Sequence, residues 1–294
     1  MKKAKKKAWI IAGTVLLLGV IAYVNYRHFV PKPVSLGERE YAVEAKSLTV
    51  EAQGHTIYGE LLLPQGLEGK LPTVICSHGF GSSYQMFKTG AGMSLAKSGF
   101  AVYCFDFYGG SANSKSGGSM TEMSVFTEQE DLNAVIDMVK TLETTDSDHL
   151  FLLGESQGGF VSAITAADRP DDVSALILYY PALCIPDDAR ARYATAADIP
   201  DTYKIMGRTV GRVYSEGLYD YDVFSVIPGY DGPVLIIHGD ADKVVDLSYS
   251  ERAEKVYPNA ELVVLSGQGH GFTGAGKTEA AKLTFDFIIR TIEG

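Results

Sequence analysis

Two kinds of hydrophobic pattern follow each other along this chain. From residue 73 onward, short and almost continuously apolar runs alternate with longer segments in which apolar residues recur at helical spacing. The runs predict buried strands at 73–77, 100–105, 149–153, 174–180, 233–238 and 261–265. The segments between them predict helices at 85–98, 124–142, 157–167 and 274–292. Such an alternation predicts an α/β protein with a mostly parallel sheet and helices on both faces.

The segment before these strands shows a different pattern, in which apolar and polar residues alternate one by one. Residues 41–53 and 55–63 both have this alternation, and Gly54 joins them. Alternation with a period of two is typical of a strand with one solvent-facing side, and glycine favours the turn between two such strands. We therefore expect an antiparallel pair at one edge of the sheet.

One long stretch carries neither pattern. Residues 182–230 contain no strong strand signal, and prolines interrupt them. Stretches of this length without a clear element are uncommon in compact domains and usually form lids or inserted subdomains. We therefore expect residues 41–294 to form one domain, with a cap inserted at about 182–230.

The N-terminal segment is cationic and then apolar. Five lysines precede an apolar run at 8–24, which approaches the length of a membrane-spanning helix. Residues 1–29 are therefore predicted to anchor the chain in the cell membrane with the domain outside the cytoplasm, followed by a linker at 30–40. The alternative is a signal peptide cleaved near Ala22, which would release a secreted protein. Recovery of a soluble product beginning at Tyr23 would exclude the anchor.

Charge and cysteine content narrow the classes of partner. The chain of 294 residues has a formal net charge of −10 although its N-terminus is cationic, so the domain itself is more acidic than the whole chain. An acidic protein repels phosphate backbones, and we expect no nucleic-acid partner. The three cysteines show no spacing typical of a disulfide framework or a zinc site, and no metal or other cofactor is expected. These features predict no oligomeric state.

A serine between glycines follows one of the predicted strands. The sequence GESQG at 154–158 matches G-x-S-x-G and lies between the strand at 149–153 and the helix at 157–167. In this context the serine occupies a tight strand-to-helix turn that exposes its hydroxyl at the end of the sheet. Ser156 is therefore the candidate nucleophile of a serine hydrolase.

A serine nucleophile needs a histidine as base and a carboxylate that orients the histidine. His270 lies in a glycine-rich loop after the last predicted strand, where its ring can reach over the strand ends. Asp240 and Asp242 both follow the strand at 233–238 and precede His270, as the order Ser, Asp, His requires. Asp242 is favoured because it lies further into the loop, whereas Asp240 is suited to capping the turn.

Acyl transfer also needs two backbone N–H groups that stabilise the oxyanion. One is expected from Gln157, the residue after the nucleophile. The other is expected from Phe80 in the sequence HGFG at 78–81, directly after the first predicted parallel strand. Only the backbone of Phe80 is needed for this role, so its ring can line the substrate pocket.

Together these motifs resemble the α/β-hydrolase superfamily over nearly the whole domain. Five segments resemble the cinnamoyl (feruloyl) esterase branch of bacterial carboxylesterases: HGFGSS at 78–83, FDFYG at 105–109, GESQGG at 154–159, YYPALCIPDDAR at 179–190 and HGDADKVV at 238–245. The resemblance implies an α/β-hydrolase fold with a cap inserted between the sixth and seventh strands. It also implies the triad Ser156, Asp242 and His270 and the oxyanion donors Phe80 and Gln157.

The chain departs from that branch at two places near the site. The branch usually continues FDFYG with Gly-His-Gly-x-Ser, whereas this chain has GGSANS at 109–114. The branch also commonly has histidine where Glu155 precedes the nucleophile. Neither departure removes a catalytic group, but both bear on acyl specificity.

The resulting prediction is a serine carboxylesterase that acts on small-molecule esters through an acyl-enzyme. Aromatic acyl groups such as hydroxycinnamoyl, or short acyl groups, are favoured because the expected cap is rich in tyrosine. Candidate substrate contacts are the carboxylates of Asp187 and Asp188, which could accept a phenol hydroxyl, and the rings of Tyr193 and Tyr214.

Two other classes of function stay open. The sequence GFTGAGKT at 271–278 matches G-x-x-x-x-G-K-[ST] between a strand and a helix, so a nucleotide-binding P-loop is one alternative. A P-loop protein would need further strands that supply an acidic magnesium ligand, and only a helix is predicted after this segment. The second alternative is a non-catalytic binding protein on a hydrolase scaffold, which would not need all three triad residues.

Overall fold

The described part of the chain covers the whole predicted domain. The computed structural model describes residues 35–294. The predicted anchor at 1–29, its cleavage alternative and positions 30–34 of the linker lie outside these residues. Among the described residues, no helix combines the length and the apolar character that crossing a membrane requires.

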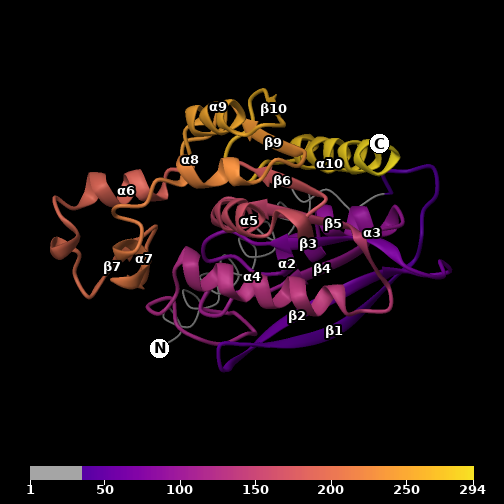
Figure 1. The fold of residues 1–294 in the computed structure, drawn as a ribbon, viewed down its shortest axis with the longest axis horizontal. Helices are drawn as coiled ribbons and strands as arrows, with labels where there is room; N and C mark the ends of the chain where they lie inside the picture. Colours follow the sequence, from indigo (N-terminus) through magenta and orange to yellow (C-terminus); the bar gives the residue numbers. More distant parts are fainter. Residues whose placement is uncertain (1–34) are drawn as a thin grey trace, which may run out of the picture.

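An eight-stranded sheet in the order β1-β2-β4-β3-β5-β6-β9-β10 runs through the domain (Figure 1). Its strands are β1 (Val43–Ala52), β2 (His55–Pro64), β3 (Leu71–Ser77), β4 (Ala101–Phe105), β5 (Thr145–Glu155), β6 (Ala175–Tyr179), β9 (Val234–Gly239) and β10 (Ala260–Leu265). From β4 to β10 in this order all neighbours pair in parallel. The mostly parallel sheet is confirmed, and each predicted strand is present.

The alternating segments form the antiparallel edge of the sheet, as predicted. β1 pairs with β2 from Val43 opposite Pro64 to Ala52 opposite His55, and β2 pairs antiparallel with β4. Most of β1 is exposed because it forms the edge, whereas β2 buries residues such as Leu61 in the core.

Helices cover both faces of the sheet, which confirms the predicted layers. One face carries α4 (Val125–Lys140), α5 (Gln157–Asp168) and α9 (Leu247–Val256), and the other carries α3 (Ala91–Lys97) and α10 (Ala275–Glu293) (Figure 1). Successive residues of β5 enter opposite cores: Leu152 packs on the side of α5, and Leu153 packs on the side of α10. This two-sided burial explains why the strand sequences are continuously apolar.

Two helical regions differ from the prediction. The helix predicted at 85–98 consists of α2 (Gln85–Lys88) and α3, because Gly90 between them has a backbone that is neither helical nor extended, with φ −128° and ψ −126°. A Cβ at Gly90 would lie 2.8 Å from the carbonyl oxygen of Met86, so the break depends on glycine. The helix α9 was not predicted, since its buried face consists only of Ser250 and Ala253 and gives little apolar signal.

The segment between β6 and β9 forms the cap, which projects from one end of the domain (Figure 1). It contains α6 (Ile185–Arg192), η2 (Ala196–Asp198), β7 (Thr202–Ile205), β8 (Arg208–Gly211), α7 (Val213–Glu216), α8 (Val223–Val226) and η3 (Ile227–Gly229), while η1 (Pro170–Asp172) lies in the main domain. The β7–β8 hairpin was not predicted, because its strands are short and of mixed polarity. Met206 and Gly207 at its turn both have positive φ, 48° and 79°, as a type I′ turn requires.

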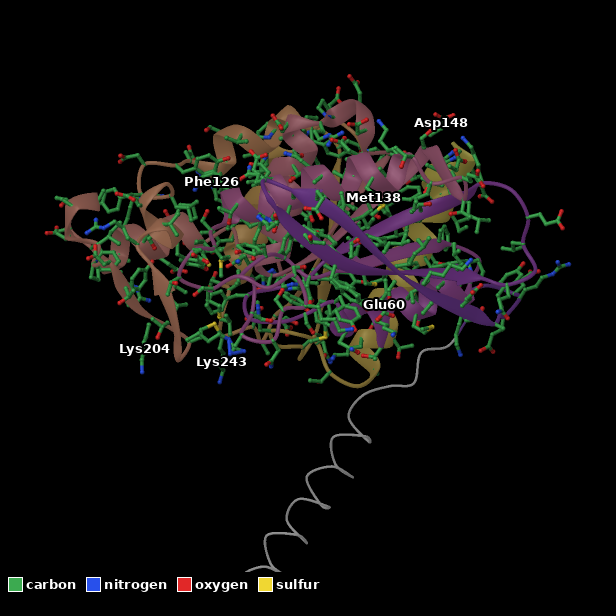
Figure 2. The ribbon with its side chains drawn as sticks, turned by 90° about the horizontal axis from the view of Figure 1, so that it is seen from below. Glu60, Phe126, Met138, Asp148, Lys204 and Lys243 are labelled. Atoms are coloured by element: carbon green, nitrogen blue, oxygen red, sulfur yellow. The ribbon has the colours of Figure 1, made fainter. Side chains whose placement is uncertain are left out.

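The cap lies at the end of the molecule where the parallel strands finish. In Figure 2, Lys204 on β7 and Lys243 just after β9 lie toward one end, and Asp148 near the start of β5 lies toward the other. The Arg208 guanidinium of the hairpin donates a hydrogen bond to the carbonyl oxygen of Gly81, in the loop after β3, at 3.1 Å. Ligands of α/β proteins bind in the crevice at the carboxyl ends of the parallel strands, which is where the cap lies.

Candidate active site

Ser156 stands at the sharp turn between β5 and α5. Its φ of +52° lies in the left-handed region, which is costly for a residue with a side chain. A Cβ at Gly154 would lie 2.4 Å from the carbonyl oxygen of Gly158, and a Cβ at Gly158 would lie 2.1 Å from that of Ser77. Only glycine therefore fits at positions 154 and 158, and the turn exposes the serine hydroxyl beyond the sheet.

The structure brings the three residues of the predicted triad together. His270 Nε2 lies 2.9 Å from Ser156 Oγ, and His270 Nδ1 lies 2.7 Å from Asp242 Oδ2. The serine follows β5, the aspartate follows β9 and the histidine follows β10, so three separate strand ends supply the group. A carboxylate at Nδ1 favours the tautomer whose unprotonated Nε2 faces the serine hydroxyl, as proton abstraction requires.

Of the two candidate acids, Asp242 contacts the histidine and Asp240 does not. The Asp242 side chain is 0 % exposed and accepts the backbone N–H groups of residues 244 and 245 at 2.8 and 3.1 Å. Burial raises the pKa of the Asp242 carboxyl, but these donors and His270 outweigh burial and hold the pKa below its ordinary value. Asp240 instead accepts the N–H of Gly267 at 2.6 Å, which ties its loop to the turn after β10.

A second histidine, His238, approaches the same carboxylate, and no role was predicted for it from the sequence. His238 Nε2 lies 3.3 Å from Asp242 Oδ2 and 3.1 Å from the carbonyl oxygen of Val245, and its Nδ1 lies 2.7 Å from Ser250 Oγ. Burial lowers the pKa of the His238 imidazole, so the ring is neutral and Nε2–H can donate to the two oxygens. The available signal was its position at the end of β9, just before the acid.

The loop after β3 lies directly against the serine. A Cβ at Gly79 would lie 3.1 Å from Ser156 Cβ, so the next residue, Phe80, is at the catalytic centre. Within residues 35–294, neither the Phe80 N–H nor the Gln157 N–H donates to a protein acceptor. Two uncommitted donors beside a serine hydroxyl are the arrangement that an oxyanion hole needs.

Behind these donors lies a buried chain of hydrogen bonds that was not predicted from the sequence. The Tyr214 hydroxyl donates to Gln157 Oε1 at 2.7 Å, and Gln157 Nε2 donates to Glu128 Oε2 at 2.8 Å. Burial raises the pKa of Glu128 to about 8 against the opposing hydrogen bond from Gln157, and Asp131 adds to the increase. Glu128 is therefore neutral at pH 7. A glutamate in the first turn of a helix is ordinary, so the sequence offered no signal for it.

Of the four predicted substrate contacts, Tyr214 alone contacts an oxyanion residue in the described structure. Asp187 accepts hydrogen bonds from Arg190 at 2.5 Å and from the Tyr249 hydroxyl at 2.9 Å, so its carboxylate is already engaged. The ring of Tyr193 packs edge-to-face on that of Tyr203, and Asp188 is exposed. No hydrogen bond joins these three residues to the triad within the described part of the chain.

A cavity of about 400 Å³ adjoins the triad, and none of its lining residues belongs to the cap. Glu155 and Gly271, the neighbours of the serine and the histidine, form part of its wall. Burial raises the pKa of Glu155, whose Oε2 accepts the Tyr180 hydroxyl at 2.9 Å, and the Tyr180 ring centroid lies 4.6 Å from that of His270. The rest of the wall includes Met86, Phe87, Asn113, Phe272 and Lys277.

The P-loop-like segment at 271–278 delivers the histidine and begins α10. Phe272 is buried and packs edge-on against Tyr180, with ring centroids 4.7 Å apart. The Thr273 N–H donates to Gln268 Oε1, and the Gly276 N–H donates to the carbonyl oxygen of Thr273, both at 2.9 Å. A P-loop needs its N–H groups to face phosphates. The geometry therefore gives the nucleotide-binding alternative no support.

Neither a metal site nor a disulfide bond is present among the described residues. Residues 35–294 contain no group of His, Cys, Asp and Glu side chains that could hold a metal ion. Cys76, Cys104 and Cys184 are buried free thiols, in agreement with a spacing that is not typical of a disulfide framework.

Sequence comparison identifies relatives over most of the chain. Residues 70–225 match the Hydrolase_4 family model, which is described as "Serine aminopeptidase, S33". Monoacylglycerol lipase ABHD6 of Bos taurus is 23 % identical over 329 aligned residues, which cover 95 % of this chain and 94 % of that protein. Monoglyceride lipase of Rattus norvegicus is 26 % identical over 228 residues, covering 75 % and 71 % respectively.

Solved structures share the fold. Est1E from Butyrivibrio proteoclasticus with ferulic acid bound has a TM-score of 0.75 and 26 % identity, covering 84 % of this chain and all of that one. Alpha/beta hydrolase domain-containing protein 10 from mouse has a TM-score of 0.69 and 19 % identity, covering 84 % and 100 %, and supports the fold alone. The α/β-hydrolase fold predicted from the motifs is confirmed.

Proposed function

Since the chain belongs to the Hydrolase_4 family of α/β-hydrolases and is a serine hydrolase, we propose that it cleaves carboxylic esters through an acyl-enzyme on Ser156. The observation that carries this proposal is the pair of contacts from His270, 2.9 Å to Ser156 and 2.7 Å to Asp242. A serine hydroxyl becomes a nucleophile at neutral pH only beside such a base. The lipases among the relatives support an ester as the scissile bond.

In the proposed mechanism, His270 Nε2 takes the proton from Ser156 Oγ as the oxygen attacks the ester carbonyl carbon. The N–H groups of Phe80 and Gln157 donate to the resulting oxyanion, and the Asp242 carboxylate stabilises the imidazolium. His270 then protonates the leaving alkoxide, and the alcohol departs from the acyl-enzyme. Water attacks the acyl-enzyme by the same route, which releases the carboxylic acid and restores the serine.

The proposed substrates carry an aromatic acyl group, such as hydroxycinnamoyl, or a short one. The similarity to Est1E, whose structure holds ferulic acid, supports the aromatic group. The Phe80 ring is half-buried beside the oxyanion donors, packs edge-to-face on Tyr214 and offers an apolar surface to such a group. The lipase relatives make long-chain monoacylglycerols the competing class.

A substrate panel on the full-length chain in detergent tests this proposal. The panel contains p-nitrophenyl acetate, methyl ferulate, its analogue without the phenol hydroxyl, a C12 monoacylglycerol and an amino-acid p-nitroanilide. We expect the first two to have the highest kcat/KM and Ser156→Ala to lower turnover at least about 10³-fold.

Three outcomes would contradict parts of the proposal. A panel led by the C12 monoacylglycerol, with no effect of the phenol, removes the aromatic assignment and leaves a general esterase. Faster cleavage of the anilide replaces the esterase by an aminopeptidase. Turnover that survives Ser156→Ala in a folded protein removes the serine mechanism itself.

A further inference from the structure

One side chain of the cap contacts both residues that carry the proposed oxyanion donors. Tyr214 on α7 donates its hydroxyl to the side chain of Gln157 at 2.7 Å. Its ring packs edge-to-face on that of Phe80 at a centroid distance of 5.6 Å. Tyr214 is only 4 % exposed, so water does not compete for either contact.

We propose that Tyr214 is a positioning residue through which the cap holds the oxyanion hole in its working geometry. This inference rests on the proposed esterase function and assigns the cap a part in the chemical step, in addition to any part in substrate binding.

The contact with Gln157 constrains the donor that follows the nucleophile. Gln157 is the first residue of α5 and comes directly after the strained Ser156. Its side-chain amide is held at both ends, because Oε1 accepts from Tyr214 and Nε2 donates to Glu128 on α4. Side chains from α7 and α4 therefore hold Gln157 from both sides, next to the backbone N–H that is the proposed oxyanion donor. A buried acceptor that loses its donor is costly, so Gln157 stays in place while Tyr214 is present.

The contacts with the loop after β3 constrain the other donor. The Phe80 ring is held by Tyr214, and the next residue, Gly81, accepts a hydrogen bond from Arg208 of the cap hairpin at 3.1 Å. The Nε atom of Arg208 lies 2.1 Å from where a Cβ at Gly81 would stand, so the hairpin fits closely against this loop. A cap that served only as a substrate wall would need none of these contacts.

Loss of positioning and loss of a pocket wall would have different kinetic effects when Tyr214 is altered. Oxyanion stabilisation acts in the transition state, so loss of positioning lowers kcat by a similar factor for every acyl group. Loss of a pocket wall would raise KM for large acyl groups and leave an acetyl ester unaffected.

Tyr214→Phe is the main test, because it removes the hydroxyl and keeps the ring on Phe80. We expect kcat to fall about tenfold for both p-nitrophenyl acetate and methyl ferulate, with KM nearly unchanged. The loss is smaller than the 10²- to 10³-fold loss that removal of an oxyanion donor causes. The matched control is Tyr219→Phe, which should leave kcat unchanged because, among residues 35–294, the Tyr219 hydroxyl donates to the cap carbonyls of Tyr193 and Ala194 and to no residue of the site.

Arg208→Ala provides a second variant at an exposed position, where folding is not at risk. We expect it to lower kcat by a smaller factor that is again independent of the acyl group. An effect of Tyr214→Phe on methyl ferulate alone, seen in KM, would overturn the inference and make Tyr214 a pocket wall. Unchanged kcat in both variants would overturn it as well. If the wild-type chain cleaves no ester, the proposed function fails instead, so the two failures are distinguishable.

Discussion

Two buried carboxyl groups flank the candidate nucleophile, and they exist in opposite states. Asp242 lies on the histidine side with a side chain that is 0 % exposed, and Glu128 lies behind the oxyanion donors at 1 % exposure. The pKa of Asp242 lies below its ordinary value, whereas the pKa of Glu128 is raised to about 8. At pH 7 the first carboxyl is charged and the second is neutral.

The difference between them lies in the donors that each carboxyl receives. Asp242 accepts two backbone N–H groups and the histidine, so its charge is well solvated by the protein. Glu128 accepts one amide from Gln157 and has Asp131 one turn away on the same helix. Neither side chain is exposed to solvent, but Glu128 also lies deeper in the protein, so burial and the smaller number of donors together keep its carboxyl neutral. The negative charge is thus kept beside the histidine, which becomes cationic, and is kept away from the oxyanion.

The largest effect is expected for Asp242→Asn, which removes the charged carboxyl beside the histidine and lowers kcat. An amide cannot stabilise the imidazolium and can hold His270 in the wrong tautomer, so we expect kcat for p-nitrophenyl acetate to fall about 10³-fold or more. Asp240→Asn is the matched control and should cost less than about threefold, since Asp240 contacts Gly267 and not the histidine. A larger loss in Asp240→Asn would reverse the assignment of the acid.

The next effect is expected for Glu128→Ala and concerns the free energy of unfolding. Glu128→Ala leaves the buried Gln157 amide without its carboxyl acceptor and opens a cavity, so we expect a loss of about 3 kcal/mol in the free energy of unfolding. Glu128→Gln offers an amide oxygen in place of the carboxyl and should cost much less. Urea denaturation of the three proteins at pH 6 measures both losses, and equal losses would show that the acceptor is unimportant.

The last prediction concerns how the stability of the protein changes with each unit of pH. The folded state keeps the Glu128 proton up to about pH 8, whereas an unfolded chain loses it near 4.5. In this window the folded state binds more protons, so the stability from Glu128 is complete below about pH 4.5 and is lost as the pH rises toward 8. We expect wild type to lose up to about 1.4 kcal/mol per pH unit relative to Glu128→Gln. Parallel stability curves between pH 5 and 8 would mean that Glu128 is charged in the folded state.

The centre of the main sheet was predictable from sequence because strands such as β4, β6 and β9 are buried on both sides, and its antiparallel edge was predictable from the alternation of polarity. Continuous apolar runs such as 149–153 and 233–238 have few alternatives once helices separate them. The elements that were missed bury little. The hairpin of β7 and β8 and the helix α9 have mixed polarity, and the break at Gly90 depends on a close approach to the Met86 carbonyl that no local pattern reveals.

The residues of the site also fall into a group that was predictable from sequence and a group that was not. Ser156, Asp242 and His270 lie in loops whose residue types and chain order follow from the chemistry they would perform, so motifs could point to them. His238, Glu128 and the contacts of Tyr214 depend on which elements meet in space. Tyr214 lies 57 positions after Gln157 and 134 positions after Phe80, and side-chain identity alone carries no sign of such pairings.

The crowded turn around the nucleophile also determines how a saturation screen of this chain should be interpreted. Any side chain at Gly158 collides with the backbone carbonyl of Ser77, and one at Gly154 collides with the carbonyl of Gly158 itself. Backbone atoms cannot swing aside as a flexible side chain can, so both positions should tolerate as few replacements as Ser156 does. Intolerance to substitution at these glycines would reflect steric crowding. An activity-based map that treats every intolerant position as catalytic would therefore count two catalytic residues too many.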